Sequence, residues 1–430
     1  MTSPLDLNYM KLVRFSFSLI DFWPHREMKT KNPVPLANNK FLFCLILFVV
    51  VAELIYMKNN VGVLSFLVLG HTYITGLITF LCLFRLTLPW IKGYRQLIID
   101  FIENIHVFHY KDESEYSMKT YNKIYNFSVC FTIFLHVQMY SGVLLFNITP
   151  LHNNIRAGLL KEKVSPNDTI DIELSIYYDL PFDSQTNLTA YFLVFIFNLY
   201  VSLINTLVLC INELFISLIA IHLWGHFKIL EYNLINFPKP KITIKTNSTL
   251  IGEKNISYSE EESIMVKKLL IENVNRHRMA TNFLSKSVNV FGPTMCLYYA
   301  FQQISECIIL CEICKLEAEA LGKYGILTLV LFQQLIEISV VYEIMSSMAS
   351  TLTQYITYES NGKIINAVYS LPWECMTLEN QKLVLFFLKN VQVPFNLKAL
   401  SMVPIGAQTM VAILKTSFSY FIMLRAIAYD

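Results

Sequence analysis

Seven stretches of apolar residues, each about as long as a membrane-spanning helix, constrain this chain more than any other feature. A helix needs about 20 mostly apolar residues to cross the hydrocarbon core of a bilayer. The stretches lie at Phe41–Met57, Val61–Phe84, Ile124–Phe146, Thr189–Cys210, Val288–Cys311, Gly325–Met345 and Ile405–Leu424. The sequence therefore predicts an all-α polytopic membrane protein with seven transmembrane helices, whose natural solvent is the lipid bilayer.

The composition excludes several other classes of protein. Only 15% of the 430 residues are charged, whereas soluble domains average about 25%. The formal net charge of +2 provides no strong basic field, so we expect no nucleic-acid partner. Five of the nine cysteines lie inside apolar runs, where a thiol behaves as a small hydrophobe, and we expect no disulfide scaffold: Cys44, Cys82, Cys130, Cys210 and Cys296.

Three of the predicted spans continue as helical patterns beyond the bilayer. Apolar residues recur at helical spacing after Cys210, before Val288 and after Met345. A helix that leaves the membrane with an apolar stripe needs a packing partner, so we expect a helical anchor bundle on one side. The expected organisation begins with a cytoplasmic N-terminal segment at 1–40, followed by spans one to four at 41–221 with an outer loop at 147–188. A cytoplasmic extension and anchor at 222–287 then leads into spans five and six at 288–345. The chain continues with a further cytoplasmic anchor at 346–404 and the last, pore-lining helix at 405–425.

The distribution of Lys and Arg predicts which loops face the cytoplasm. The segments 1–40, 85–123, 222–287 and 346–400 together carry a net charge of +9, whereas 58–60, 147–188 and 312–324 together carry −3. Basic loops are retained in the cytoplasm. We therefore expect a cytoplasmic N-terminus and an extracellular C-terminus, with the first apolar run as a signal anchor rather than a cleaved signal peptide.

The glycosylation sequons give mixed support for this orientation. Asn147, Asn167 and Asn187 begin Asn-x-Thr triplets in the predicted outer loop, and we expect glycans there. Asn247 and Asn255 also begin sequons, but they lie in a predicted inner loop. These two triplets count against the orientation unless they occur by chance.

Two other functional classes compete with a channel or binding protein. A G-protein-coupled seven-helix receptor has its N-terminus outside, and neither Asp-Arg-Tyr after the third span nor Asn-Pro-x-x-Tyr in the last span occurs here.

A membrane di-iron enzyme would need several histidine boxes with paired histidines. The only box-like spacings are His222 with His226 and His106 with His109. A zinc site needs a second cysteine pair beside Cys311 and Cys314. We therefore expect no enzyme activity, no metal and no other cofactor.

The C-terminal part of the chain resembles a known family. Tyr369 and Trp373 stand four residues apart, and the last span ends in Leu-Lys-Thr-Ser-Phe-Ser-Tyr-Phe at 414–421. These features are similar to the insect odorant receptor family. The Leu-Pro-Trp-Glu-Cys-Met string at 371–376 and the pair Trp23-Pro24 resemble its moth sex-pheromone receptor branch.

The resemblance implies a ligand-gated non-selective cation channel in the plasma membrane of olfactory neurons. It also implies a hetero-oligomer, a heterotetramer with the odorant co-receptor. Cytoplasmic helices that include Tyr369 and Trp373 would form the anchor between subunits. The expected ligand is a volatile, fatty-acid-derived pheromone, namely a long-chain unsaturated alcohol, aldehyde or acetate.

The last predicted span carries the candidate pore residues. One helical face presents Thr416, Ser419, Met423 and Ala426. A hydrophobic constriction can gate a pore by dewetting, and the resemblance aligns the hydrophobic gate of the co-receptor with Met423. The alternative is a simple helix-packing face, because small residues favour close packing in membranes. Lys415 in the same span can snorkel to the interface.

The resemblance places the ligand in the outer halves of spans two, three, four and six. A long apolar ligand with one polar end suits apolar walls with a few polar groups, because each buried CH₂ contributes about 0.8 kcal/mol and an unpaired hydroxyl costs about 1–3 kcal/mol. Each candidate could instead serve only helix packing, and the polar partner is left open. The candidates are Phe66, His71, Tyr73, His136, Tyr140, Phe195, Asn198, Phe332, Gln333 and Ile336.

Overall fold

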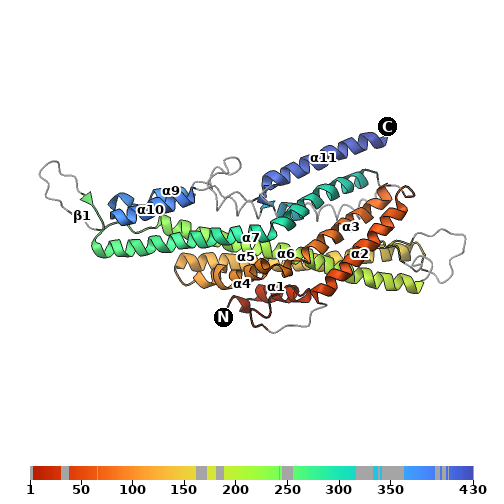
Figure 1. Ribbon diagram of the computed structural model, residues 1–430, viewed down its shortest axis with the longest axis horizontal. Coiled ribbons are helices and arrows are strands. Elements are labelled where there is room, and N and C mark those ends of the chain that lie inside the picture. Colours follow the sequence, from red (N-terminus) through yellow and green to blue (C-terminus); the bar gives the residue numbers. More distant parts are fainter. Residues whose placement is uncertain are drawn as a thin grey trace.

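The protein is an elongated set of helices that run along one long axis (Figure 1). The computed structural model describes residues 3–30, 38–64, 66–160, 172–180, 188–241, 243–244, 255–315, 333–337, 339–340, 363–392, 398–399, 403–404 and 406–429. Within these residues the only strands form two short antiparallel pairs, β1 (Thr243–Ile244) with β2 (Asn255–Ile256) and β3 (Lys398–Ala399) with β4 (Val403–Pro404). The predicted all-α class is confirmed.

The predicted spans coincide with helices wherever the structure describes them. The helices are α2 (Asn39–Asn60), α3 (Phe66–Arg85), α5 (Glu115–Arg156), α6 (Leu188–Ile235), α7 (Glu260–Lys315) and α11 (Ala407–Tyr429). Among the described residues, α2, α3, α5 and α6 are long and apolar enough to cross a membrane. The predicted span Gly325–Met345 lies mostly outside the described residues, which cover helical stretches at 333–337 and 339–340.

Three helices are far longer than a bilayer is thick. Helices α5, α6 and α7 have 42, 48 and 56 residues, and at 1.5 Å per residue α6 and α7 are about 72 and about 84 Å long. The hydrocarbon core measures about 30 Å. The predicted extensions of α6 and α7 are therefore helical, but the continuation of α5 beyond Phe146 was not predicted. Helix α7 bends along its length (Figure 1), and Pro293 inside it removes one backbone hydrogen bond.

The extensions define two ends of the molecule. At one end α9 (Lys363–Tyr369), the 3₁₀ turn η5 (Trp373–Cys375) and α10 (Leu378–Val391) pack along α6 and α7. We call this the extension end. At the other end α2 turns into α3, and the segment 172–180 lies between helices (Figure 1). We call this the loop end.

The N-terminal segment is part of the core. Helix α1 (Asn8–Leu19) follows the short turn η1 (Pro4–Asp6) and contacts α5 and α6. The Met10, Val13 and Phe17 side chains of α1 are fully buried, and the Phe17 ring meets the edge of Phe215 on α6 at 5.5 Å. The sequence predicted only a cytoplasmic segment at 1–40, because twelve helical residues with mixed polarity give a weak signal beside long apolar runs.

The predicted loop 85–123 is also largely helical. It contains η2 (Leu88–Trp90), α4 (Lys92–Asp100), the π turn η3 (Phe101–Ile105) and η4 (Val107–Tyr110). The Tyr94 hydroxyl of α4 donates to Asn212 Oδ1 on α6 at 3.1 Å. Asn198, Asn205 and Asn212 recur every seven residues along α6, and Asn212 forms the kind of hydrogen bond between elements that membrane packing favours.

Candidate functional site

A short extended segment, 172–180, fills the space between α2, α3, α5 and α6 at the loop end. Loops normally stay at the surface because their backbone polar groups need water. Here most of the segment is buried, namely Ile172, Leu174, Ser175, Ile176 and Tyr178. The surrounding helices must therefore supply the hydrogen-bond partners that water would otherwise provide.

Polar side chains of three helices bind the backbone and hydroxyl groups of this segment. His71 of α3 bonds through Nε2 to the carbonyl of Ser175 at 2.9 Å. The Asn198 amide of α6 donates to the carbonyl of Ile176 at 3.0 Å. The Ser175 hydroxyl donates to Asn147 Oδ1 of α5 at 2.8 Å. Because a carbonyl can only accept, the His71 Nε2 atom carries the proton.

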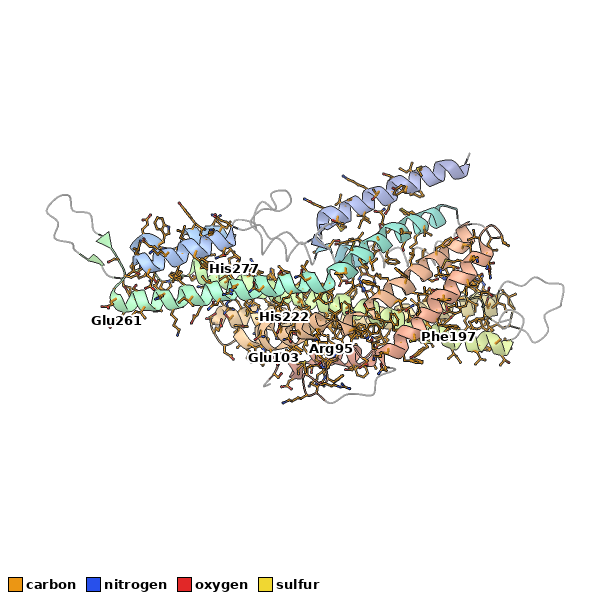
Figure 2. The ribbon with its side chains drawn as sticks, in the orientation of Figure 1. Arg95, Glu103, Phe197, His222, Glu261 and His277 are labelled. Carbon is orange, nitrogen blue, oxygen red and sulfur yellow. The ribbon has the colours of Figure 1, made fainter. Side chains whose placement is uncertain are left out.

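Aromatic rings enclose the same segment. The Tyr177 ring stacks with Tyr56 of α2 at 5.7 Å, and the Tyr178 ring meets Phe197 of α6 at 5.8 Å. Figure 2 labels Phe197 at the loop end of the molecule. Apolar and aromatic walls with a few oriented polar groups are the usual lining of a small-molecule site. The loop end is therefore the best candidate for a ligand site.

Several of the predicted ligand-binding residues lie at or near this segment. His71 and Asn198 contact it directly, and the His71 ring also stacks on Phe146 of α5 at 5.8 Å. Tyr73 and Phe195 are half-buried on α3 and α6. Glu53 of α2, which is fully buried near Tyr178, was missed, although a single carboxylate inside the apolar run 41–57 is a signal of function in a membrane helix.

The structure does not bring His136 to this site. Its Nε2 atom bonds to the Ser16 hydroxyl of α1 at 2.8 Å, and its Nδ1 atom bonds to the Thr132 carbonyl at 2.7 Å. Helix α5 continues to Arg156, so its loop end lies beyond the predicted 124–146. His136 stands about 16 Å below Asn147 along the helix axis. Tyr140, whose ring lies 6.4 Å from His136, is 39% exposed.

The candidates on the sixth predicted span are only partly described. Gln333 forms a reciprocal amide pair with Gln138 of α5, at 3.2 and 3.0 Å. Ile336 is exposed. Phe332 lies outside the described residues, and the Phe66 side chain is not described. An amide pair that satisfies itself is better suited to joining helices than to binding a ligand.

A glycan at Asn147 does not fit this structure. Asn147 is 1% exposed, its amide donates to the Val143 carbonyl at 2.8 Å, and its Oδ1 accepts from Ser175. The sequon was assigned to an outer loop because the predicted span stopped at Phe146, whereas α5 continues to Arg156. Asn167 and Asn187 lie outside the described residues.

Helix α11 packs on α7 through one face and leaves another uncovered by the described residues. Ile413, Ser417 and Phe421, which follow one another at intervals of four residues, are buried. Gln303 of α7 donates to the Ser417 hydroxyl at 2.9 Å. The predicted pore residues Thr416, Ser419 and Met423 are exposed, although the Thr416 hydroxyl also donates to Gln303 Oε1 at 2.8 Å. The Ala426 side chain is not described.

The family-motif residues near α9 lie on a surface rather than in the core. Tyr369 is 66% exposed and Trp373 is 39% exposed. The neighbouring helix α10 also exposes Leu378, Leu385 and Phe386. Beneath them, Phe387 of α10 packs on His277 of α7 at 5.7 Å, and Figure 2 labels His277 where α7 passes α9 and α10. An exposed apolar patch of this kind marks an interaction surface.

A second buried polar cluster lies toward the extension end, around His222 (Figure 2). Tyr9 Oη lies 2.6 Å from His106 Nε2 and 3.1 Å from His222 Nε2. The backbone amides of Phe108 and Val107 donate to His106 Nδ1 and His222 Nδ1 at 3.1 and 3.2 Å. An amide can only donate, so each Nδ1 is unprotonated and each Nε2–H donates to Tyr9.

This tautomer assignment argues against a metal site. A metal would need both Nε2 atoms as unprotonated ligands, and the imidazoles would then lose their only protons. Burial, with the nearby His226 as a second cause, lowers the pKa of His222 to about 3, so the rings stay neutral. No group of three metal-ligating side chains occurs in the part of the chain that the structure describes. The predicted histidine boxes therefore serve packing and hydrogen bonding.

A buried ion pair joins three helices between the two ends. Arg85 Nη1 at the end of α3 lies 3.1 Å from Glu213 Oε1 of α6 and donates to the Leu209 carbonyl at 2.9 Å. Its guanidinium also sits 5.5 Å from the centre of the Tyr298 ring of α7. Both charged side chains are almost fully buried. The attraction between Arg85 and Glu213 offsets part of the free-energy cost of burying two charged side chains among helices.

Comparisons with known proteins agree with this architecture. The family described as "7tm Odorant receptor" matches residues 65–418, more than half of the chain. Odorant receptor 13a of Drosophila melanogaster is 20% identical over 252 residues, which cover 58% of this chain and 56% of that receptor. The alignment thus spans little more than half the length of that relative.

Solved structures share the fold over nearly the full length. The insect olfactory receptor OR5 from Machilis hrabei superposes with a TM-score of 0.70 at 11% identity, covering 97% of this chain and 99% of that chain. The same receptor in complex with eugenol gives a TM-score of 0.70 at 11% identity, covering 97% of each chain. At this level of identity the likeness concerns the fold alone.

Proposed function

Because the chain belongs to the insect odorant receptor family, we propose that it is a receptor subunit that opens a non-selective cation channel when a volatile ligand binds. Proteins of this family are multi-pass membrane chemoreceptors and not enzymes. The subunit works in a hetero-oligomer with the odorant co-receptor. Ligand binding shifts the channel toward its open state only if the open state binds the ligand more tightly.

The uncovered face of α11 is the observation that carries this proposal. Ser417 fastens the helix to α7, while Met423 is 52% exposed and lies on the same side as Thr416 and Ser419. In a closed ring of subunits, such faces from each copy surround the central axis. Met423 then forms part of an apolar constriction, together with the aligned residues of the co-receptor, and this constriction gates the pore by dewetting.

The string at 371–376 and the pair Trp23-Pro24 support the moth sex-pheromone branch as the source of the ligand. The ligand is a long-chain unsaturated alcohol, aldehyde or acetate, because the loop end combines apolar walls with a few polar groups. The hydrocarbon chain supplies affinity at about 0.8 kcal/mol for each buried CH₂. The head group supplies orientation and discrimination.

The charge distribution supports a cytoplasmic N-terminus. The segment 172–180 then faces the outside, where a volatile ligand arrives, and the extension end lies in the cytoplasm. The exposed apolar surface that includes Tyr369, Trp373 and Phe386 contacts neighbouring subunits there. A tag at the N-terminus is expected to stay unstained in unpermeabilised cells, and staining would favour the G-protein-coupled alternative.

Current recording from oocytes tests the channel itself. Oocytes would express this chain with the co-receptor, or either protein alone, and receive a panel of long-chain unsaturated alcohols, aldehydes and acetates. We expect a rapid cation current that requires both proteins and one ligand class. Absence of current despite proven surface expression would contradict the proposal.

Replacement of Met423 tests the gate. Met423→Ala removes the thioether from the proposed constriction, so the basal current should rise severalfold relative to the ligand-evoked current. Ile422→Ala is the matched control, because Ile422 is 53% exposed on the same helix but does not belong to the proposed pore face. Equal behaviour of the two variants would refute the assignment of Met423.

A further inference from the structure

The buried face of α11 contains one polar residue among apolar ones. Ile413 and Phe421 are 6% and 7% exposed, and Ser417 between them is 1% exposed. Apolar contacts have no preferred direction, so a helix held by them alone can turn about its axis at little cost. Hydrogen bonds between membrane helices are directional and fix the relative placement of the helices. The contacts of Ser417 and its neighbour Thr416 therefore help to decide how α11 is turned on α7.

A single side chain of α7, Gln303, binds both hydroxyls. Its Nε2 atom donates to the Ser417 hydroxyl at 2.9 Å. Its Oε1 atom accepts from the Thr416 hydroxyl at 2.8 Å. Consecutive residues of a helix point about 100° apart. A helix held by one hydrogen bond can swing about it, whereas two bonds in different directions to one amide oppose rotation either way.

The other contacts of Ser417 with α7 are longer. Glu306 Oε2 lies 3.4 Å from the Ser417 hydroxyl, and the Cys307 thiol lies 3.7 Å from the Ser417 carbonyl. Most hydroxyl bonds are shorter than about 3.0 Å, and a thiol is a weak donor. Gln303, Glu306 and Cys307 lie three and four residues apart, on one face of α7. The Gln303 amide is therefore the strongest link of Ser417 to this face.

The face of α11 that Gln303 holds is also the face of the proposed gate. Thr416 and Met423 are seven residues apart, which places them about 10.5 Å apart along the axis and only about 20° apart around it. Met423 is 52% exposed, and Ile422 beside it is 53% exposed. A turn of α11 by one residue would point Ile422 in the direction that Met423 now takes. The contact that fixes Thr416 therefore also fixes the direction of Met423.

The bond to Thr416 can be released without leaving that hydroxyl unpaired. A hydroxyl carries one proton, and the Ala412 carbonyl of the same helix lies 2.5 Å from the Thr416 oxygen. When α11 turns, Thr416 can donate to Ala412, while the Gln303 amide loses its partners. The cost of the turn therefore falls on the amide of Gln303 rather than on Thr416. The contact opposes rotation but does not forbid it.

We propose that Gln303 is a positioning residue that holds the rotation of α11 and so points Met423 at the pore axis. A ligand that opens the channel by turning α11 has to break this pair of hydrogen bonds. The inference rests on the proposed function, because it assigns what keeps the proposed gate in place. It gives a role to a glutamine of α7, a helix on which the sequence analysis placed no site residue.

The first experiment measures the direction of α11 without relying on current. Met423→Cys or Ile422→Cys is introduced singly into the full chain, with and without Gln303→Leu, and expressed with the co-receptor in oocytes. A charged, membrane-impermeant thiol reagent is applied from outside, and mass spectrometry of the purified chain measures the rate of modification at each site. Thiols react as thiolates, which form in water, so a pore-facing cysteine reacts faster than one that faces lipid or protein.

Gln303→Leu keeps a similar side-chain volume but removes both hydrogen bonds. The ratio of the modification rate at position 423 to that at position 422 should fall about threefold to tenfold, the range of a hydrogen bond of ordinary strength. Thr416→Val removes only one of the two bonds and should lower the ratio less. The same variant provides the test if Gln303→Leu does not reach the cell surface.

Gln138→Leu is the matched control. Gln138 of α5 pairs with Gln333 rather than with α11, so its loss removes a glutamine pair between other helices and should leave the ratio unchanged. Current recording supplies a second readout. Gln303→Leu should raise the ligand-free current about threefold to tenfold relative to the ligand-evoked current.

Three outcomes would overturn the positioning role. One is an unchanged ratio in Gln303→Leu. Another is an equal change of both modification rates, which would indicate a general loosening of α11 rather than a rotation. The third is a fall of the same size in Gln138→Leu. A fall of the ratio in Gln303→Leu, in a chain that passes no current despite proven surface expression, would support the positioning role and contradict the channel proposal separately.

Discussion

The two buried polar clusters of this receptor each contain a buried tyrosine but differ in how completely their polar atoms are hydrogen-bonded. Toward the extension end, both ring nitrogens of His106 and of His222 have a partner, and Tyr9 joins the rings. At the loop end, Glu53, Tyr178 and Asn198 retain atoms without a described partner. A satisfied network holds elements together, whereas an unsatisfied one leaves interactions for a ligand.

The difference teaches how to separate structural from functional polar residues in a membrane protein. Residue type alone does not separate them, because a buried tyrosine belongs to each cluster, Tyr9 to one and Tyr178 to the other. The state of each donor and acceptor does separate them. Removal of a group from the satisfied cluster should therefore destabilise the fold, whereas removal of an unpaired group should affect ligand response and leave stability intact.

The largest effect is expected at the ion pair between the two clusters. Arg85→Ala leaves the Glu213 carboxylate buried without its partner, and the loss of unfolding free energy should be about 3–5 kcal/mol. Arg95→Ala is the control, because the pair of Arg95 with Glu27 is largely exposed and should contribute about 0–1 kcal/mol. Thermal unfolding in detergent and surface expression measure both. Similar losses for the two variants would break the link between burial, pairing and stability.

The next largest effect is expected at Tyr9. Tyr9→Phe removes the oxygen that accepts from both imidazoles, and each orphaned buried donor costs about 1–3 kcal/mol. The expected destabilisation is about 2–4 kcal/mol in the same unfolding assay. Tyr232→Phe, at a tyrosine that is 37% exposed, should have little effect. An unchanged melting temperature for Tyr9→Phe would show that this cluster does not fasten α1.

The histidines near the extension end predict a dependence of stability on pH. Burial is the main cause that lowers the pKa of His222 to about 3, with nearby His226 as a further cause. Burial is also the main cause that lowers the pKa of His226 to about 3, with Arg276 as a further cause. Burial lowers the pKa of His277 to about 4. Their ordinary value is 6.5. Below that pH the unfolded chain binds protons that the native chain does not, so stability falls with decreasing pH.

The slope should be about 1.4 kcal/mol per pH unit for each histidine below about pH 6. Melting temperatures measured from about pH 7.5 to about pH 5 would show it. His277→Gln should flatten the slope by the contribution of one group. A melting temperature that does not change over this range would mean that these rings are hydrated or protonated in the native protein.

The smallest effect on stability is expected at Glu53. Glu53→Gln replaces a fully buried carboxyl group, which has no ion-pair partner among the described residues, by an amide of the same size, so the unfolding free energy should change by less than about 1 kcal/mol. A loss of stability as large as that of Tyr9→Phe would erase the distinction between the two clusters.

The apolar periodicity predicted the helices but not all of their ends. Where the structure describes them, six of the seven predicted spans are helical, because runs of apolar residues are a strong and local signal. The end of α5 was misplaced, since Asn147 and Asn154 are polar in the sequence yet buried against the segment 172–180. The early end of the predicted span placed Asn147 in a loop, where a glycan is expected, and placed His136 in the outer half of the span.

The sequence by itself determined the membrane environment, the helical class and the family, because composition, apolar length and motif spacing are properties of the linear chain. Tertiary structure decided which polar residues are satisfied. His71 and His136 look alike in the sequence, but one binds the segment 172–180 and the other binds α1. Glu53, Tyr178 and Asn198 are far apart along the chain and meet only through the packing of α2 and α6 around that segment. Hydrogen bonds depend on distances of a few ångströms between distant residues, and only folding sets those distances.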